Sequence, residues 1–434
     1  MKQFNWGSIF DPILLSLRMV GLWPSSDSYK ANSYTLYAFI CVPLFMLANT
    51  FFQAINIFMV EMDLKALAAA LFVAAHVMAV VKIAALLIHL KTLKKLTSHV
   101  NHLKLQACGN RHGKVVEINL KMWMMLYRGF QVGVSTMVIF WLCRPFLDNS
   151  YKNYELPIFS WYPFDVKSTP WYQFAYIYQI ISIIFMAIAN LNLDSLSLSL
   201  MVYIGTQCDI LCDNLKAIRN LSDLVRCIKY HKAVLRFAVD FNVFFSNIIL
   251  GQFFTSVATI ALGLFKLTLT VPGSSEFYTL VAFFNMGTFQ IFLYCWFGNE
   301  VELKSTNIPE AAFQSEWIGV SLNFQKTLLI FLTRTQRHIS ITAFNLFPLS
   351  LQTFMTVSST SVSEAFAITK LPIDAVVAQA EFGAPGRGCS PTTTVILFCQ
   401  QALPHSSPLS RRNVPYGQTV TLSTKEANFY QPFH

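Results

Sequence analysis

Long apolar stretches alternate with shorter polar segments through most of the sequence. Each long stretch contains at least the ~20 residues that a helix needs to cross the hydrocarbon core of a bilayer. The pattern therefore predicts an all-α, multi-spanning membrane protein with seven transmembrane helices. We expect six of these helices at residues 34–60, 67–90, 125–146, 174–204, 241–269 and 278–301, and a seventh that begins near Ile339.

The composition agrees with a membrane protein and changes the meaning of the net charge. Hydrophobic residues make up 54% of the chain and charged residues 12%, whereas about a quarter of a typical soluble domain is charged. The net charge of +10 is therefore assigned to membrane topology and contact with anionic lipid, and we expect no nucleic-acid partner. Catalytic motifs and cysteine pairs at metal-ligand spacing are absent from the sequence, so we expect no enzyme, metal site or cofactor.

Lys and Arg are distributed unevenly between the two sides of the predicted membrane. Four alternate segments contain 21 of them, and the other loops between helices contain 5. Segments with the excess of Lys and Arg are usually cytoplasmic. The N-terminal segment is therefore expected inside the cell, and the seventh helix is expected to leave the membrane on the outer side. The four segments assigned to the cytoplasm are 1–33, 91–128, 205–238 and 302–338.

This orientation separates the classes of seven-helix protein. A G-protein-coupled receptor has its amino terminus outside the cell, and it usually carries Asp-Arg-Tyr-like and Asn-Pro-x-x-Tyr motifs that this sequence lacks. A membrane transporter would show internal repeats, or broken helices at matching positions of two halves. We find no such repeat, and a transporter is kept as an alternative from a different class.

Two cytoplasmic regions are predicted to be helical. Apolar residues recur at helical spacing from Asp194 into segment 205–238, which indicates that membrane helices continue into the cytoplasm. Segment 302–338 is predicted to hold an intracellular anchor helix that starts at Pro309, because proline suits the first turn of a helix. Apolar residues that follow at helical spacing include Trp317, Phe324 and Leu328.

A set of short motifs occurs in a fixed order in the second half of the sequence: Tyr294-Cys295, Gly298-Asn299, Ala312-Phe313 with Trp317, Arg334 to Arg337, and Pro348 to Phe354. This set resembles the insect odorant receptors. That family carries a Tyr-Cys pair, a Gly-Asn exit, an Ala-aromatic pair followed by Trp, a basic turn and a Pro-Leu-Ser-Leu-x-Thr-Phe sequence. Earlier matches are Asp194, Leu196, Gln207 and Leu211, then His231, Phe237, Gln252 and Phe253.

The resemblance implies a ligand-gated, non-selective cation channel that serves the perception of smell. In this family an odour-tuning subunit assembles with a shared odorant receptor co-receptor into a heterotetramer in the plasma membrane of sensory neurons. The intracellular anchor holds such subunits together, which gives Trp317, Phe324 and Leu328 that expected role. This chain lacks a long insertion near 205–238, so we expect the odour-tuning subunit and not the co-receptor.

The same resemblance implies an odorant pocket in the outer halves of the helices, beside the ion path. A small volatile ligand has few polar atoms and needs an enclosed, aromatic-rich cavity. For each candidate lining residue, ordinary helix packing or lipid contact is the alternative. The candidates are Phe72, His76, Met137, Phe140, Trp141, Tyr178, Ile181, Thr259 and Leu262.

One lysine lies within a predicted membrane helix. A charged side chain in the membrane is costly and usually has a structural or functional reason. We expect Lys82 to extend its side chain toward the inner membrane surface, with a role in a pocket or water path as the alternative. Asp194 is expected near the inner end of the fourth helix, where pairing or hydration is easy.

The sequence departs from the family pattern after Val357. Residues 358–434 are rich in Ser, Thr, Pro and Gly, and we expect a disordered tail produced by an altered reading frame or a mis-joined exon. The seventh helix is then expected only to begin within 339–357. Expected pore residues are therefore restricted to Gln352, Thr353 and Thr356. A non-functional isoform and a gustatory receptor are further alternatives.

Overall fold

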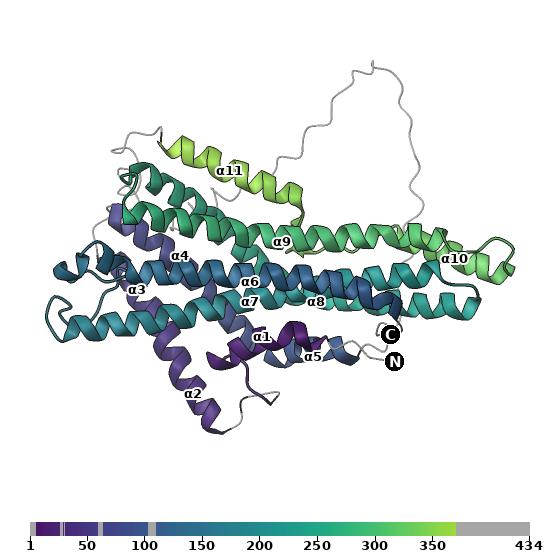
Figure 1. Ribbon diagram of the computed structural model, residues 1–434, viewed down its shortest axis with the longest axis horizontal. Coiled ribbons are helices and arrows are strands. Elements are labelled where there is room, and N and C mark those ends of the chain that lie inside the picture. Colours follow the sequence, from purple (N-terminus) through teal and green to yellow (C-terminus); the bar gives the residue numbers. More distant parts are fainter. Residues whose placement is uncertain (1–5, 27–28, 30, 60–63, 103–109, 370–434) are drawn as a thin grey trace, which may run out of the picture.

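The computed structural model describes residues 6–26, 29, 31–59, 64–102 and 110–369. Within these residues the chain is almost entirely helical, and its longest helices run side by side in an elongated bundle (Figure 1). The prediction of an all-α membrane protein is therefore confirmed. In chain order the helices are α1 (Gly7–Met19), α2 (Ser33–Cys41), the π-helix η1 (Val42–Leu47), α3 (Ala48–Met59), α4 (Leu64–Ile88), α5 (Leu90–His102), α6 (Asn110–Leu147), the 3-10 helix η2 (Ser150–Asn153), α7 (Trp171–Lys216), α8 (Leu221–Leu269), α9 (Ser275–Phe313), α10 (Leu322–Thr335) and α11 (Leu351–Thr369).

Most of the predicted spans correspond to helices of this bundle. Among the described residues, five helical segments are long and apolar enough to cross a membrane: Ser33–Met59, Gly113–Leu147, α7, α8 and α9. A sixth is obtained when α4 and α5, which bend by 75° at their junction, are counted as one broken span. α11 corresponds to the predicted seventh transmembrane helix.

Three helices extend well beyond a bilayer, and the sequence predicts this extension for two of them, α7 and α8. α7, α8 and α9 contain 46, 49 and 39 residues, and at 1.5 Å per residue each exceeds a hydrocarbon core of about 30 Å. A short turn joins α7 to α8. Asn220 ends that turn and caps α8, because its side chain accepts a hydrogen bond from the Asp223 N–H at 2.9 Å.

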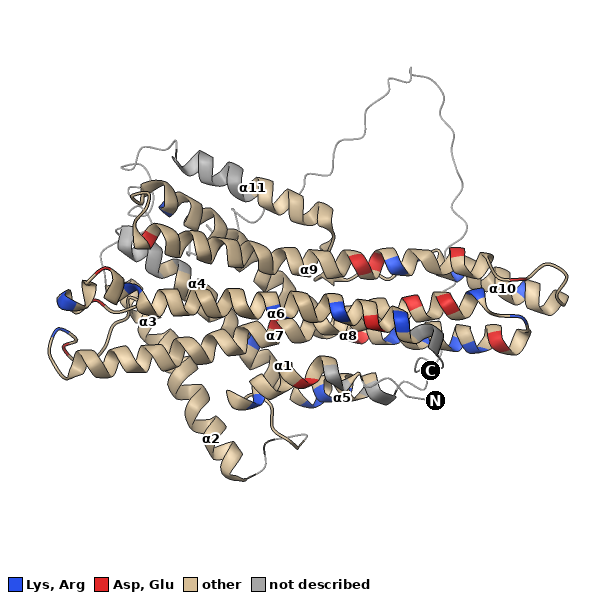
Figure 2. Cartoon of the chain, in the orientation of Figure 1, with Lys and Arg blue, Asp and Glu red and all other residues tan. Residues whose placement is uncertain are grey.

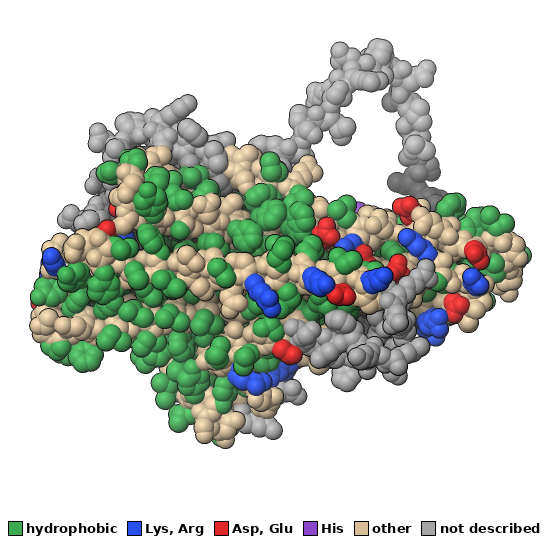
Figure 3. All heavy atoms as spheres, viewed as in Figure 1, with side chains coloured by type: hydrophobic (Ala, Val, Ile, Leu, Met, Phe, Trp, Pro, Cys, Tyr) green, Lys and Arg blue, Asp and Glu red, His purple; other side chains and the backbone are tan. Residues whose placement is uncertain are grey.

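Charged and apolar side chains occupy different parts of the bundle. Figure 2 shows many Lys, Arg, Asp and Glu residues along the end of the bundle that carries α10, and smaller groups of them in the loops at the opposite end. The face visible in Figure 3 is covered mainly by hydrophobic side chains over its other half. The end with α10 therefore has the character expected of the cytoplasmic side.

The predicted helix start at Pro309 is wrong. α9 continues without a break through Pro309 and ends at Phe313. Proline removes one backbone hydrogen bond from a helix and crowds the preceding turn, but burial of Ile308 and Ala311 beside it holds this turn in the core. Trp317 lies in the turn after α9, so the predicted anchor segment contains one separate helix, α10.

The predicted start of the seventh helix near Ile339 is also wrong. Two short antiparallel strands, β1 (Thr342–Ala343) and β2 (Phe347–Pro348), come first. Phe344 and Asn345 between them have φ angles of 48° and 56°, so the chain reverses here instead of forming a helix. α11 then begins at Leu351.

The expectation that residue 357 ends the ordered part of the seventh helix is wrong as well. α11 crosses the change in composition after Val357 and continues to Thr369. Hydroxyl groups in this segment bond to the helix backbone: Thr356 Oγ1 donates to the Gln352 carbonyl at 3.0 Å, and Ser359 Oγ donates to the Thr356 carbonyl at 2.9 Å. Ser and Thr are thereby accommodated in a membrane helix. The remainder of the predicted tail, 370–434, lies outside the described residues.

Candidate ligand-binding site

A cavity of about 150 Å³ lies among α4, α6, α7, α8 and α9. Its residues on α9 fall between Phe283 and Gln290, in the half of that helix farthest from α10. The cavity is therefore in the half of the bundle that the charge pattern assigns to the outer side. Residues of five helices, from Ala75 on α4 to Gln290 on α9, meet around it.

One wall of the cavity is apolar and aromatic. α6 contributes Phe130, Val134 and Met137, and α9 contributes Phe283 and Phe284. Phe130 is buried. This wall offers contact to an apolar body but no charged group, as in most pockets for small organic ligands.

Another part of the lining is polar. Asn190 on α7, Gln252 and Ser256 on α8, and Gln290 on α9 contribute to the wall. The Gln252 amide nitrogen donates to Ser256 Oγ at 2.8 Å and to Gln290 Oε1 at 3.2 Å. Side chains from α8 and α9 are therefore held together at the surface of the cavity.

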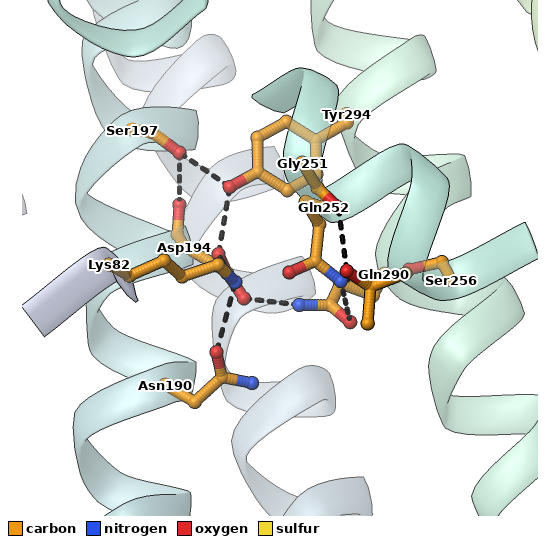
Figure 4. Close-up of polar contacts among 10 residues, drawn as sticks. Lys82, Asn190, Asp194, Ser197, Gly251, Gln252, Ser256, Gln290 and Tyr294 are labelled. Atoms are coloured by element: carbon orange, nitrogen blue, oxygen red, sulfur yellow. Dashed lines mark hydrogen bonds and ion pairs between the residues drawn. The ribbon is translucent and has the colours of Figure 1, made fainter. Parts of the chain in front are cut away.

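A buried ion pair lies directly behind this polar wall (Figure 4). Lys82 Nζ on α4 is 2.6 Å from Asp194 Oδ1 on α7, and the two side chains are 2% and 1% exposed. Lys82 also donates to Asn190 Oδ1 at 2.9 Å. A buried ion pair is stable only when further hydrogen bonds satisfy its remaining polar atoms.

The surrounding residues provide those bonds. The Tyr294 hydroxyl donates to Asp194 Oδ1 at 2.8 Å, and the Gln290 amide nitrogen donates to Asp194 Oδ2. Ser197 Oγ lies 3.0 Å from the Tyr294 hydroxyl. The network therefore connects α4, α7, α8 and α9, and its members Asn190, Gln252 and Gln290 reach the cavity.

The expectation that Lys82 extends to the inner membrane surface is wrong. Its ammonium group is buried and paired with Asp194, because these two residues face each other across α4 and α7. Asp194 is paired, which is one of the two expectations, but it is buried in the interior of α7 and does not lie near a helix end. Sequence analysis noted both charges but did not pair them, and they are 112 positions apart in the chain.

Only part of the predicted pocket set lines this cavity. Met137 and Thr259 do so, and the Thr259 hydroxyl donates to the Ser256 carbonyl at 3.0 Å. Phe72 instead packs on Trp141, with ring centroids 4.5 Å apart, and His76 Nδ1 is 2.8 Å from the Phe72 carbonyl oxygen. Phe72 also contacts Phe283 of the cavity wall, at 5.0 Å between ring centroids.

Four other predicted pocket residues lie outside the cavity lining. The Tyr178 hydroxyl donates to the Leu44 carbonyl at 2.6 Å. Phe140, Ile181 and Leu262 are half-buried on α6, α7 and α8. A role of these residues in ligand binding remains a prediction.

The predicted anchor and pore residues have different surroundings. Phe324 and Leu328 are buried inside the subunit, and Trp317 is half-buried. On α11, Gln352 is exposed, whereas the Thr353 hydroxyl donates to the Pro348 carbonyl at 2.8 Å. Thr356 also bonds to its own helix, so these threonine hydroxyls are used within the subunit.

The sequence profile of the 7tm Odorant receptor family matches residues 63–362, more than half of the chain. The chain belongs to the insect odorant receptor family. This is a receptor family and not an enzyme family, and membership favours the odorant receptor interpretation over the transporter and gustatory receptor alternatives. The profile extends past Val357 into the segment where the composition changes.

Two curated insect odorant receptors are similar along much of their length. Odorant receptor Or1 of Anopheles gambiae is 25% identical over 407 residues, which cover 81% of this chain and 92% of that receptor. Odorant receptor 23a of Drosophila melanogaster is 27% identical over 56% of this chain and 65% of its own length. These relatives support the same family over both halves of the chain.

A solved odorant receptor shares the fold. The olfactory receptor OR5 of Machilis hrabei, determined in complex with eugenol, aligns with a TM-score of 0.77 and 18% identity. The alignment covers 85% of this chain and 99% of that receptor. A second structure of the same receptor aligns with a TM-score of 0.76. The seven-helix architecture is therefore that of the insect odorant receptors.

Proposed function

We propose that this chain is the odour-tuning subunit of an odorant-gated, non-selective cation channel in the plasma membrane. The observation that carries the proposal is the cavity of about 150 Å³ among five membrane helices of a chain in the odorant receptor family. A ligand in this cavity contacts α8 and α9, which pack against α11. It opens the channel if it binds the open arrangement of these helices more tightly than the closed one.

The size of the cavity suits a small organic molecule. A protein cavity of about 150 Å³ lined by apolar side chains is large enough to bind benzene. The olfactory receptor OR5 of Machilis hrabei was determined with eugenol, also a small aromatic compound. We therefore assign this cavity, rather than the whole predicted pocket set, as the odorant site.

An exposed apolar surface on α10 and the turn before it supports assembly with other subunits. Four apolar side chains in and before α10 are strongly exposed: Ile318 (83%), Leu322 (64%), Leu329 (66%) and Ile330 (72%). Exposed apolar groups that cluster on one element commonly mark a protein interface. In this proposal they contact the odorant receptor co-receptor in a heterotetramer, while buried Phe324 and Leu328 hold α10 against its own subunit.

α11 supplies the pore-side helix of the proposed channel. Its 19 residues span roughly 28 Å at 1.5 Å per residue, close to the ~30 Å hydrocarbon core. Gln352, Thr353 and Thr356 lie in its first two turns and remain candidates for contact with the ion path. A helix of this length favours a working channel over a non-functional isoform.

The proposal is tested by whole-cell current in cells that express this chain with an odorant receptor co-receptor. We expect at least one compound in a panel of volatiles to evoke a non-selective cation current that requires both subunits. The proposal would be contradicted if no compound in the panel evoked a current from the two subunits together. In that case this chain must reach the cell surface normally, and the co-receptor must respond normally to its own agonist.

A further inference from the structure

The buried ion pair fixes which way the neighbouring amide groups face. A lysine ammonium group can only donate hydrogen bonds. Lys82 donates to Asn190 at 2.9 Å, so Asn190 must turn its oxygen toward Lys82. The Asn190 NH₂ group is then directed away from the ion pair, and no other described residue forms a hydrogen bond with it.

The aspartate fixes the opposite end of the network in the same manner. An ionised carboxylate can only accept hydrogen bonds, so Gln290 must turn its NH₂ group toward Asp194. The Gln290 oxygen therefore faces Gln252, which must donate with its own NH₂ group at 3.2 Å. The Gln252 side-chain oxygen is then left as an acceptor, without a hydrogen bond from any described residue.

The two remaining amide groups belong to residues that line the same cavity. Asn190 offers a donor and Gln252 offers an acceptor (Figure 4), and the rest of the lining is mainly apolar. The hydroxyls of Thr255 and Thr259 do not compete as donors, because they donate their protons to the backbone carbonyls of Gly251 and Ser256 at 2.7 and 3.0 Å. The cavity therefore offers a ligand the Asn190 amide donor and the Gln252 amide acceptor, next to the hydroxyl groups of Ser256, Thr255 and Thr259, in a mainly apolar lining.

We infer that the cavity selects hydroxyl-bearing ligands, namely alcohols or phenols with an apolar body of about one ring. This inference rests on the proposed function and names the ligand class of the same site. A hydroxyl group both accepts a hydrogen bond and donates one, so it can bond to Asn190 and to Gln252. An aldehyde can only accept, and a hydrocarbon does neither. A site with buried polar groups discriminates against analogues that leave those groups unpaired.

The test uses three probes of similar shape and equal numbers of non-hydrogen atoms: benzyl alcohol, benzaldehyde and ethylbenzene. Binding to the purified receptor complex in detergent is measured from the rise in Tm with ligand concentration, since a ligand of the folded state stabilises it by mass action. We expect benzyl alcohol to bind about tenfold more tightly than ethylbenzene, as two modest net hydrogen bonds allow. The affinity for benzaldehyde is expected to lie between the affinities for benzyl alcohol and ethylbenzene.

Two variants assign the preference to the named groups. Asn190→Ala removes the donor, so the affinities for benzyl alcohol and benzaldehyde should fall toward the affinity for ethylbenzene. Gln252→Leu removes the acceptor and should weaken the binding of benzyl alcohol more than the binding of the other two probes. Thr255→Val is the matched control in the lining, because its hydroxyl is bonded to the backbone. It should change the affinities for all three probes by the same factor.

The binding measurement separates failure of this inference from failure of the proposed function. If the three probes bind equally well, if none of them binds, or if both variants preserve the preference for benzyl alcohol, the hydroxyl selectivity is wrong. Current evoked by other volatiles would still support an odorant-gated channel. Should benzyl alcohol bind preferentially while no volatile evokes current, the ligand class holds and the channel proposal fails.

Discussion

Gly298 of α9 and Leu349, which follows β2, are in direct backbone contact. A Cβ atom added to Gly298 would lie 2.4 Å from Leu349 Cβ and 2.6 Å from its carbonyl oxygen. The hairpin formed by β1 and β2 docks on α9 through this contact, and the Leu349 N–H donates to the Ile341 carbonyl at 2.8 Å. The position of α11, two residues later, therefore depends on a glycine in the middle of α9.

Gly298→Ala is expected to displace the hairpin and lower the stability of the receptor. The new methyl group would meet backbone atoms that cannot rotate away, and overpacking of this kind costs about 1–3 kcal/mol. Gly129→Ala on α6 is the control, because a Cβ there meets nothing within 4 Å. Tm values of the purified variants check the difference. Equal Tm values for the two variants would show that the hairpin is free to move.

The buried ion pair of Lys82 and Asp194 leads to a second prediction about stability. Lys82→Met leaves a buried carboxylate without its cation, a change that typically costs about 3–5 kcal/mol. The pair Lys82→Met with Asp194→Asn removes both charges and should recover part of that loss. Denaturant unfolding in detergent micelles measures the coupling, and strictly additive losses would show that the two charges do not interact.

A more exposed ion pair provides the matched control for that cycle. Lys266 and Glu276 are 2.5 Å apart near the turn between α8 and α9, and their side chains are 12% and 38% exposed. Because water and salt screen such a pair, Lys266→Met is expected to cost no more than about 1 kcal/mol. A loss as large as that of Lys82→Met would argue against burial as the cause.

The exposed face of α10 is expected to control assembly without affecting the subunit itself. Ile330→Glu places a charge on a side chain that is 72% exposed, and a charge buried in a protein interface is strongly unfavourable. Recovery of the co-receptor with this chain should fall at least tenfold, while the Tm of the isolated subunit stays the same. Asn307→Glu adds the same charge to an exposed position of α9 and should leave recovery unchanged. Normal recovery of Ile330→Glu would exclude this face as the interface.

The membrane helices were predictable because each one is encoded locally. Length, apolar content and the distribution of Lys and Arg fall within single stretches of sequence, so the positions of the membrane-spanning parts of α2–α4 and α6–α9 follow from pattern alone. The motif Gly298-Asn299 was noted as a family trait. Its physical reason, the contact with Leu349, depends on two segments 51 positions apart in the printed numbering.

The errors share a physical cause. Pro309 favours a helix start in isolation, but tertiary packing carries α9 through it. Residues 339–350 look apolar enough for a helix, yet positive φ angles at Phe344 and Asn345 turn the chain back. The polar wall formed by Asn190, Gln252 and Gln290 was missed, because amide side chains on three helices converge only after the bundle packs.

The central claim is that the cavity among five helices is the odorant site that controls the current. The most direct test measures volatile-evoked current, with the co-receptor present, for the unmodified chain and for Ala75→Phe. Ala75 lies in the cavity wall on α4, so the larger phenylalanine side chain fills part of the cavity. Val77→Phe changes a side chain of the same helix that is 44% exposed and serves as the control. We predict that Ala75→Phe abolishes the volatile response, while Val77→Phe and the response to the co-receptor agonist are unaffected. An unchanged concentration–response curve for Ala75→Phe would contradict the account.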